Sequence, residues 1–132
     1  MKSAHVLIHV TFTIASIVAF TALAAPAPAT TRAEIDALLD KLESSGCQFN
    51  RNGTWHNAAE AKTHLLRKLE YLEDKDAVQS TEQFIALAAS KSSSSGKPYS
   101  VKCGGAAPIV SQTWLNRELE ALRASGSLRQ TK

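Results

Sequence analysis

The segment from Ser92 to Cys103, with the sequence SSSSGKPYSVKC, contains the residue types closest to those of a phosphate-binding or catalytic loop. A phosphate-binding loop has a Gly separated by four residues from a Gly-Lys pair, and a Ser or Thr after the Lys to hold Mg²⁺. Here the first of these positions is Lys91 and the last is Pro98. Pro98 also disfavours the helix N-terminus that would face a phosphate. The sequence therefore excludes a nucleotide-binding loop of this kind.

The same segment matches the Ser-x-x-Lys spacing of serine acyl-enzymes through Ser94 and Lys97. That chemistry places both side chains on one helical turn, where the amine accepts the hydroxyl proton. Gly96 and Pro98 disfavour a helix at this point, so we expect a solvated, flexible joint instead. A small hydrolase that uses Ser94 or Ser95 with Lys97, acting on cell-wall material, is an alternative function.

Two histidines and a carboxylate recur at intervals of four, as His56, Glu60 and His64. On one face of a helix, such side chains could ligate zinc. His56, however, precedes the residue that is expected to cap the helix, and Glu60 with His64 is explained by an i,i+4 pair. We therefore predict no metal site and no cofactor.

Aromatic and cationic residues near the Asn52-Gly53 turn and the serine run form the best candidate binding surface. An aromatic ring beside an arginine is typical of recognition hot spots, and such a group suits an anionic or sugar-like ligand. The alternative is that the rings belong to the core and the cations are solvated. The predicted binding residues are Arg51, Asn52, Trp55, Lys97 and Tyr99.

The chain of 132 residues begins like a secretory signal peptide. Lys2 precedes an apolar run that ends in Ala22-Leu23-Ala24, the small-x-small pattern that signal peptidase reads. We predict cleavage after Ala24 and loss of residues 1–24, with an uncleaved membrane anchor as the alternative. After cleavage we expect no membrane contact, because no second apolar stretch is long enough to cross a bilayer.

The two cysteines, Cys47 and Cys103, both lie beyond the predicted signal peptide. An even count in an exported chain predicts one disulfide in an oxidising compartment. Closing this loop stabilises the fold by about 4 kcal/mol in the chain-entropy model. Free thiols or a metal pair are the alternatives, but no His or Cys pair sits beside either cysteine to complete a metal site.

Capping signals and apolar periodicity predict four helices. Three of them begin with the Ser/Thr/Asn-x-x-Glu/Gln pattern of a capping box, which starts at Thr31, Asn57 and Ser80, and Ser111 is expected to cap the fourth. The expected helices cover residues 31–44, 57–74, 80–88 and 112–124.

Asn52-Gly53 is a strong hairpin signal, because a type I′ turn needs positive φ at both central residues. We expect two short strands around it, at residues 47–50 and 54–56, and a third strand at residues 98–103. The predicted fold is α+β, with about four helices packed against a small two- or three-stranded antiparallel sheet and one disulfide. The predicted organisation is a disordered spacer at 25–30, a single domain at 31–126 and a flexible tail at 127–132.

Three segments lie along the predicted mature chain between residues 45 and 123: SGCQFNRNGTWHNAAEAKTHLLRKLEY, STEQFIALAASKSSSSGKPYSVKC and SQTWLNRELEALR. As an ordered set they resemble the YfeK-like family of small bacterial periplasmic proteins, a family of unknown function. The resemblance implies a Gram-negative periplasmic location. It implies no activity and no catalytic residues.

The sequence thus favours an exported, non-enzymatic binding module for an unknown protein or envelope component in the periplasm. An inhibitor or immunity-like protein is a further alternative. The formal net charge of +3 does not indicate a nucleic-acid partner, because the basic residues do not cluster with aromatic stacking partners.

Overall fold

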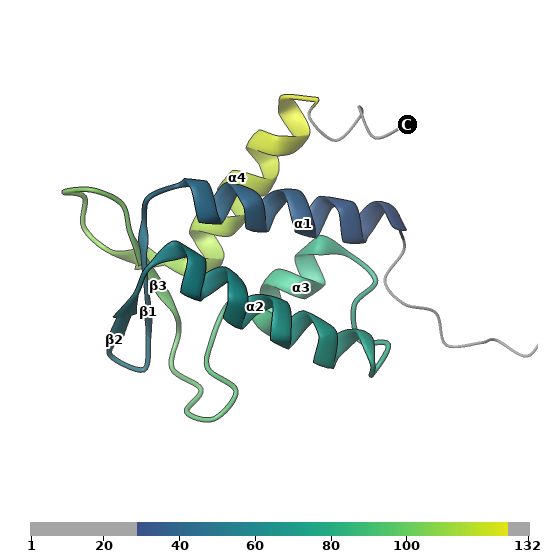
Figure 1. Cartoon of the computed structure of the whole chain (residues 1–132), viewed down its shortest axis with the longest axis horizontal. Coiled ribbons are helices and arrows are strands. Elements are labelled where there is room, and N and C mark those ends of the chain that lie inside the picture. Colours follow the sequence, from purple (N-terminus) through teal and green to yellow (C-terminus); the bar gives the residue numbers. More distant parts are fainter. Residues whose placement is uncertain (1–28, 127–132) are drawn as a thin grey trace, which may run out of the picture.

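The computed structural model describes residues 29–126, which form four helices and a four-stranded antiparallel sheet (Figure 1). The helices are α1 (Ala29–Ser44), α2 (Ala58–Glu73), α3 (Thr81–Ala88) and α4 (Ser111–Ala124). The strands are β1 (Gln48–Arg51), β2 (Thr54–His56), β3 (Ser100–Lys102) and β4 (Ile109–Val110), in the spatial order β2-β1-β3-β4. The α+β prediction is confirmed, and the sheet has four strands instead of two or three.

The predicted signal peptide at 1–24 and the predicted tail at 127–132 lie outside the described residues. The predicted spacer at 25–30 lies mostly outside them too, but α1 begins at Ala29 and so includes its last two residues. Of the helices that the structure describes, none has the length and apolar character needed to span a bilayer.

The first helix starts two residues before the predicted capping box of Thr31 and Glu34, and the box does not form. Thr31 Oγ1 instead donates to the Gln79 carbonyl (3.3 Å), and the Glu34 carboxylate accepts from Arg123 of α4 at 2.7 and 3.0 Å. The apolar stripe of this helix is fully buried and consists of Ile35, Leu38, Leu39 and Leu42.

The caps of α2 and α3 form at the predicted residues. Asn57 Oδ1 accepts from the Glu60 amide (2.9 Å), and the Glu60 carboxylate accepts from the Asn57 amide (3.3 Å). Ser80 caps α3 by accepting from the Gln83 amide (3.1 Å). The Gln83 side chain accepts from the amide of Gln79 (2.7 Å), so the return half of this second box is displaced by one residue.

Strands β1 and β2 form the predicted hairpin. Asn52 and Gly53 have φ angles of 52° and 86°, the pair of left-handed conformations that a type I′ turn requires. β3 pairs antiparallel with the other side of β1, and Asn50 lies opposite Ser100 in this register. The sheet therefore brings the end of β1 beside the chain that enters β3.

The short strand β4 was not predicted, because two residues are too few to show an alternating pattern. It pairs with β3 and continues directly into α4. Ser111, predicted as the cap of α4, is the first helical residue, and the N-cap position is Val110 without a side-chain hydrogen bond. The Ser111 amide donates to the Tyr99 carbonyl (2.9 Å). This bond gives a partner to one of the first amides of α4, which have none within the helix.

The hydrophobic core lies between the four helices and extends to the sheet. Phe84 and Ile85 of α3 are fully buried within it. Phe49 of β1 packs edge-on against Trp114 of α4, with ring centroids 5.6 Å apart. This contact anchors the sheet on the helices.

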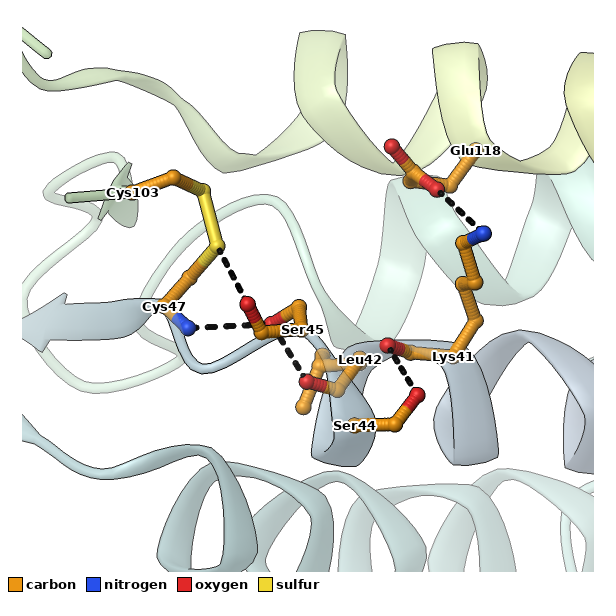
Figure 2. Close-up of a disulfide and its surroundings, with 7 residues drawn as sticks. All are labelled: Lys41, Leu42, Ser44, Ser45, Cys47, Cys103 and Glu118. Atoms are coloured by element: carbon orange, nitrogen blue, oxygen red, sulfur yellow. Dashed lines mark hydrogen bonds and ion pairs between the residues drawn. A yellow bond between two sulfur atoms is a disulfide. The ribbon is translucent and has the colours of Figure 1, made fainter.

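Cys47 and Cys103 form the predicted disulfide, which joins residues 56 positions apart (Figure 2). Cys47 leads from α1 into β1, and Cys103 follows β3. Ser45 supports the approach to the bridge, because its hydroxyl donates to the Leu42 carbonyl (2.6 Å) and accepts from the Cys47 amide (3.1 Å). A structural disulfide of this kind is typical of an oxidising compartment outside the cytoplasm.

Ion pairs join the polar faces of the helices to one another. Arg123 of α4 contacts Glu34 of α1 (2.7 Å) and Glu82 of α3 (2.6 Å). The further pairs between helices are Arg32–Glu73, Lys62–Asp40, Lys62–Glu43 and Lys41–Glu118. Arg32, Lys41, Lys62 and Arg123 thus have carboxylate partners on other helices.

Candidate anion-binding site

Two neighbouring cavities lie where α2 meets the sheet. The first cavity is lined mainly by α2 and β1 and has a volume of about 460 Å³. The second cavity is lined by the β1–β2 hairpin, α2 and the serine loop, the name used here for residues 90–99, and has a volume of about 470 Å³. Both are within the range of small-molecule sites, roughly 300–1,000 Å³. The residues that line both cavities are Arg51, His56, His64 and Tyr99.

Arg51, His64 and Tyr99 form a hydrogen-bonded chain where the two cavities meet. An Arg51 Nη lies 2.7 Å from His64 Nδ1 and 3.3 Å from His64 Nε2, and Nε2 lies 3.3 Å from the Tyr99 hydroxyl. Because a guanidinium group only donates, Nδ1 at the shorter distance carries the lone pair, and the ring proton is on Nε2. His64 then donates to Tyr99, which leaves the hydroxyl proton of Tyr99 available to a ligand.

The surroundings of His64 keep its imidazole neutral. Burial, followed by the charges of Arg51 and Lys68, lowers the pKa of His64 from 6.5 to about 4. Burial also raises the pKa of the Tyr99 hydroxyl above its ordinary value of 10.0, against a smaller opposing effect of Arg51. At neutral pH the chain therefore consists of a cation and two uncharged groups, with a donor at its end.

Lys68 brings a second cation to the second cavity, one turn after His64 on α2. Its ammonium lies 5.3 Å from the centroid of the Tyr99 ring and donates to the Lys91 carbonyl (3.3 Å). Burial, followed by repulsion from Arg51, lowers the pKa of Lys68. A bound anion would oppose both effects, because it supplies the missing counter-charge.

The lysine and arginine side chains around the two cavities have no carboxylate partner in the part of the chain that the structure describes. Among residues 29–126, no ion pair involves Arg51, Arg67 or Lys68. Glu60, at the rim of the first cavity, serves the cap of α2 and lies 3.4 Å from His56 Nδ1. None of the described residues that line the second cavity is acidic. Arg51 and Lys68 are half-buried, and this favours an anionic ligand, because unpaired charge is costly to remove from water.

Hydrogen bonds close the serine loop, which the sequence predicts as a solvated, flexible joint, and residues 93–98 are exposed. An antiparallel bridge between Lys91 and Pro98 closes it. Ser92 is 4% exposed and accepts from Asn52 Nδ2 (3.2 Å), while the Ser95 hydroxyl donates to Asn52 Oδ1 (2.5 Å). Asn52 therefore docks the loop on the tip of the hairpin, and Figure 1 shows the loop on the side of α2 where the hairpin lies.

The structure brings three of the five predicted binding residues to the cavities. Arg51 and Tyr99 line both of them, and Asn52 lines the second. Trp55 is 37% exposed on β2 and Lys97 is exposed in the serine loop, and neither lines either cavity. A binding role for these residues stays a prediction, and the geometry favours the first three.

Two cationic or polar residues at the site, His64 and Lys68, were not predicted as binding residues. The sequence suggested a Glu60–His64 pair, but Glu60 lies beside His56, and His64 contacts Arg51. No group of three His, Cys, Asp or Glu residues arranged to hold a metal ion occurs among the described residues. The sequence feature that could have indicated a shared site for His64 and Lys68 is their spacing of four residues, which places them one turn apart on a helix.

The Ser-x-x-Lys segment does not assemble a nucleophile and a base in this structure. The Ser94 hydroxyl lies 3.0 Å from the Ser92 hydroxyl, and the Ser95 hydroxyl bonds to Asn52. Lys97 contacts Ser95 through its backbone amide, which donates to the Ser95 hydroxyl (3.3 Å). These serines hold the loop in shape.

Comparison with known proteins places the chain in a family. Residues 29–123 match a model described as a family of unknown function (DUF5329). The chain belongs to this family. It is also 43% identical over 68 residues to the uncharacterized protein YfeK of Salmonella typhimurium, a match that covers 51% of this chain and 55% of the relative. The chain thus matches only about half of the length of that relative.

The DUF5329 match spans all of the sheet and nearly all of the four helices. Together with the similarity to YfeK, it confirms the resemblance seen in the sequence. No solved structure matches the chain. The family is described as of unknown function and YfeK as uncharacterized, so the function has to be inferred from the geometry of the site.

Proposed function

We propose that this DUF5329 protein is an exported, non-enzymatic binding module that holds an anionic group of a protein or envelope component in the periplasm. The anion lies against Arg51 and Lys68 and accepts a hydrogen bond from the Tyr99 hydroxyl. The single observation that carries this proposal is the absence of any carboxylate partner for these two cations among residues 29–126.

The chemistry of the site supports an anion in preference to a neutral or cationic ligand. Arg51 and Lys68 are half-buried, and a charged hydrogen bond at such a position is about twice as strong as a neutral one. His64 is neutral and fixes the orientation of Arg51 on one side and Tyr99 on the other. The ligand therefore meets donors that are already oriented, which lowers the entropic cost of binding.

Export to the periplasm is supported by the disulfide between Cys47 and Cys103 and by the signal-peptide pattern of residues 1–24. A binding role is supported further by the place of the serine loop and the hairpin, which are mounted on a disulfide-linked sheet. Loops on a rigid scaffold commonly carry recognition.

The test is a titration of protein purified from the periplasmic fraction with sulfate, acetate and glucose at pH 7, followed by NMR signals of the Arg51, His64 and Tyr99 side chains. We expect sulfate and acetate to shift these signals saturably and glucose to leave them unchanged. Saturable shifts with glucose alone would show that the site recognises a neutral sugar and would contradict the proposal.

Two matched substitutions locate the binding. Arg51→Gln removes a charged hydrogen bond and should weaken sulfate binding about tenfold or more. Lys97→Gln removes the same charge from an exposed position outside both cavities and should change the affinity less than twofold. Equal losses in the two variants would mean that sulfate follows net charge only and not the Arg51 site.

A further inference from the structure

The first cavity changes in character from its rim to its inner end. At the rim, Glu60 and Arg67 are exposed. Most of the buried lining residues are apolar, namely Phe49, Leu65 and Ala89, and the buried Tyr99 and Ser111 add hydroxyl groups to them. A ligand that fills this cavity therefore has a polar or charged part near the rim and a hydrocarbon part toward the core.

Small side chains create the space in this cavity. Ala59 and Ala61 come from α2, and Ala89 follows α3. Protein interiors otherwise pack at high density, and a gap of about 460 Å³ beside Phe49 forfeits contacts that a hydrocarbon chain would supply. The apolar part of the cavity thus adjoins the Arg51 cation, which lines the same cavity.

His56 also lines the first cavity. Nε2 of His56 is buried and has no hydrogen-bond partner among the described residues, while Nδ1 of the same ring faces Glu60 at 3.4 Å. A buried polar atom normally has a partner. This atom has almost no accessible surface, so the contacts of a ligand come from the other lining residues.

We propose that the first cavity binds a small amphipathic organic acid, with its anionic group at Arg51 and the Tyr99 hydroxyl and its hydrocarbon body against Phe49 and Leu65. This inference rests on the proposed function and specifies the ligand class for the same site. The wall made by Phe49, Leu65 and Ala89 favours a hydrocarbon body over a free sugar, because these side chains carry no hydrogen-bonding group, although Ser111 adds a hydroxyl to the lining.

The test is a series of linear carboxylates that differ only in chain length, namely acetate, butyrate, hexanoate and octanoate. Binding to protein purified from the periplasmic fraction is measured by calorimetry at pH 7. Each buried methylene should tighten binding up to about fourfold until the cavity is full. Equal affinity for acetate and octanoate would overturn the inference.

An uncharged partner of the series tests the role of the anionic group. Hexanol has the hydrocarbon body of hexanoate without its charge, and it should bind at least tenfold more weakly, because it forms no charged contact with Arg51. Equal affinity for hexanol and hexanoate would show that the cavity binds hydrocarbon alone and would contradict the inference.

Two leucine substitutions on helices provide a matched pair. Ala61→Leu fills the cavity and should reduce hexanoate affinity to that of acetate, with acetate affinity unchanged. Ala121→Leu, at an exposed position of α4, should leave the whole series unchanged. Full hexanoate affinity in a folded Ala61→Leu variant would contradict the inference, and the chain-length series tests it even if this variant does not fold.

The two proposals fail in different ways. If sulfate and acetate bind but chain length has no effect, the amphipathic ligand is wrong and the anion site stands. If neither sulfate nor any carboxylate binds, the proposed function is wrong, and the inference that rests on it is wrong as well.

Discussion

Cations at the two ends of the helical layer have different kinds of partner. Away from the sheet, Arg123 contacts carboxylates of two other helices, Glu34 and Glu82, and lies 2.7 and 2.6 Å from them. Beside the sheet, Arg51 contacts a neutral histidine, and Lys68 contacts a carbonyl and an aromatic ring. Cationic side chains therefore stabilise the packing of the helices at one end, and at the other end they are available to a ligand.

The pKa directions follow the same division. Hydrogen bonds from Arg123, as the largest effect, lower the pKa of Glu34 and of Glu82, so both carboxylates favour their charged, paired form. At the sheet end, burial lowers the pKa of His64 and of Lys68, and the neighbouring cations add to the effect. A region whose groups resist further positive charge is one that an anion would stabilise.

The largest expected effect concerns the disulfide that joins the residue before β1 to the residue after β3. Replacement of Cys47 and Cys103 by Ser should lower the free energy of unfolding by about 4 kcal/mol, because the unfolded chain regains the freedom of a long loop. Urea denaturation monitored by circular dichroism measures the change. Wild-type protein under reducing conditions should match the double variant, and an unchanged midpoint in both would contradict a stabilising role.

The comparison of the two arginines is tested by making the same substitution at each. Arg123→Gln should destabilise the fold by about 1 kcal/mol, since it removes exposed ion pairs, and should leave sulfate binding unchanged. Arg51→Gln should do the reverse, with sulfate binding weakened and the free energy of unfolding changed by less than that amount. Thermal unfolding and sulfate titration of both variants measure the contrast. If either substitution produced the effects expected of the other, the division into a structural and a binding end would be wrong.

A smaller effect is expected in the dependence of stability on pH. His64 has a pKa of about 4 in the folded protein and titrates near 6.5 when unfolded. Between these values the unfolded chain takes up a proton that the folded protein does not, so stability falls as the pH drops from about 6.5 toward 4. The His64→Gln variant should lack this component. Urea midpoints measured at several pH values test it, and parallel curves for the two proteins would contradict it.

The local parts of the fold could be predicted from the sequence. Asn52-Gly53 specifies its turn through φ, and Asn57 and Ser80 specify their caps through hydrogen bonds to amides three residues away. Glu34 shows where this reasoning fails. It has the spacing of a capping box with Thr31, but the helix begins earlier and Glu34 pairs with an arginine from the other end of the chain.

The candidate site was only partly predictable, because its residues come from segments that are far apart in the sequence and meet only in the folded chain. The register of β1 with β3 brings Arg51 to Tyr99, and the packing of α2 adds His64 to them. Residue type and nearness in sequence to the turn and the serine run grouped Trp55 and Lys97 with the site, although both lie outside the cavities. A cation without a carboxylate partner can be identified only when the three-dimensional neighbours of each carboxylate are known.

The most direct test of the account is the pKa of His64, measured by NMR of its ring with and without sulfate, which keeps its charge across the pH range of interest. We expect a pKa of about 4 in the free protein and a clear rise when sulfate is bound, because the anion offsets the charges of Arg51 and Lys68. A pKa near 6.5 that sulfate does not change would show that these cations neither act on His64 nor bind an anion, and would contradict the account.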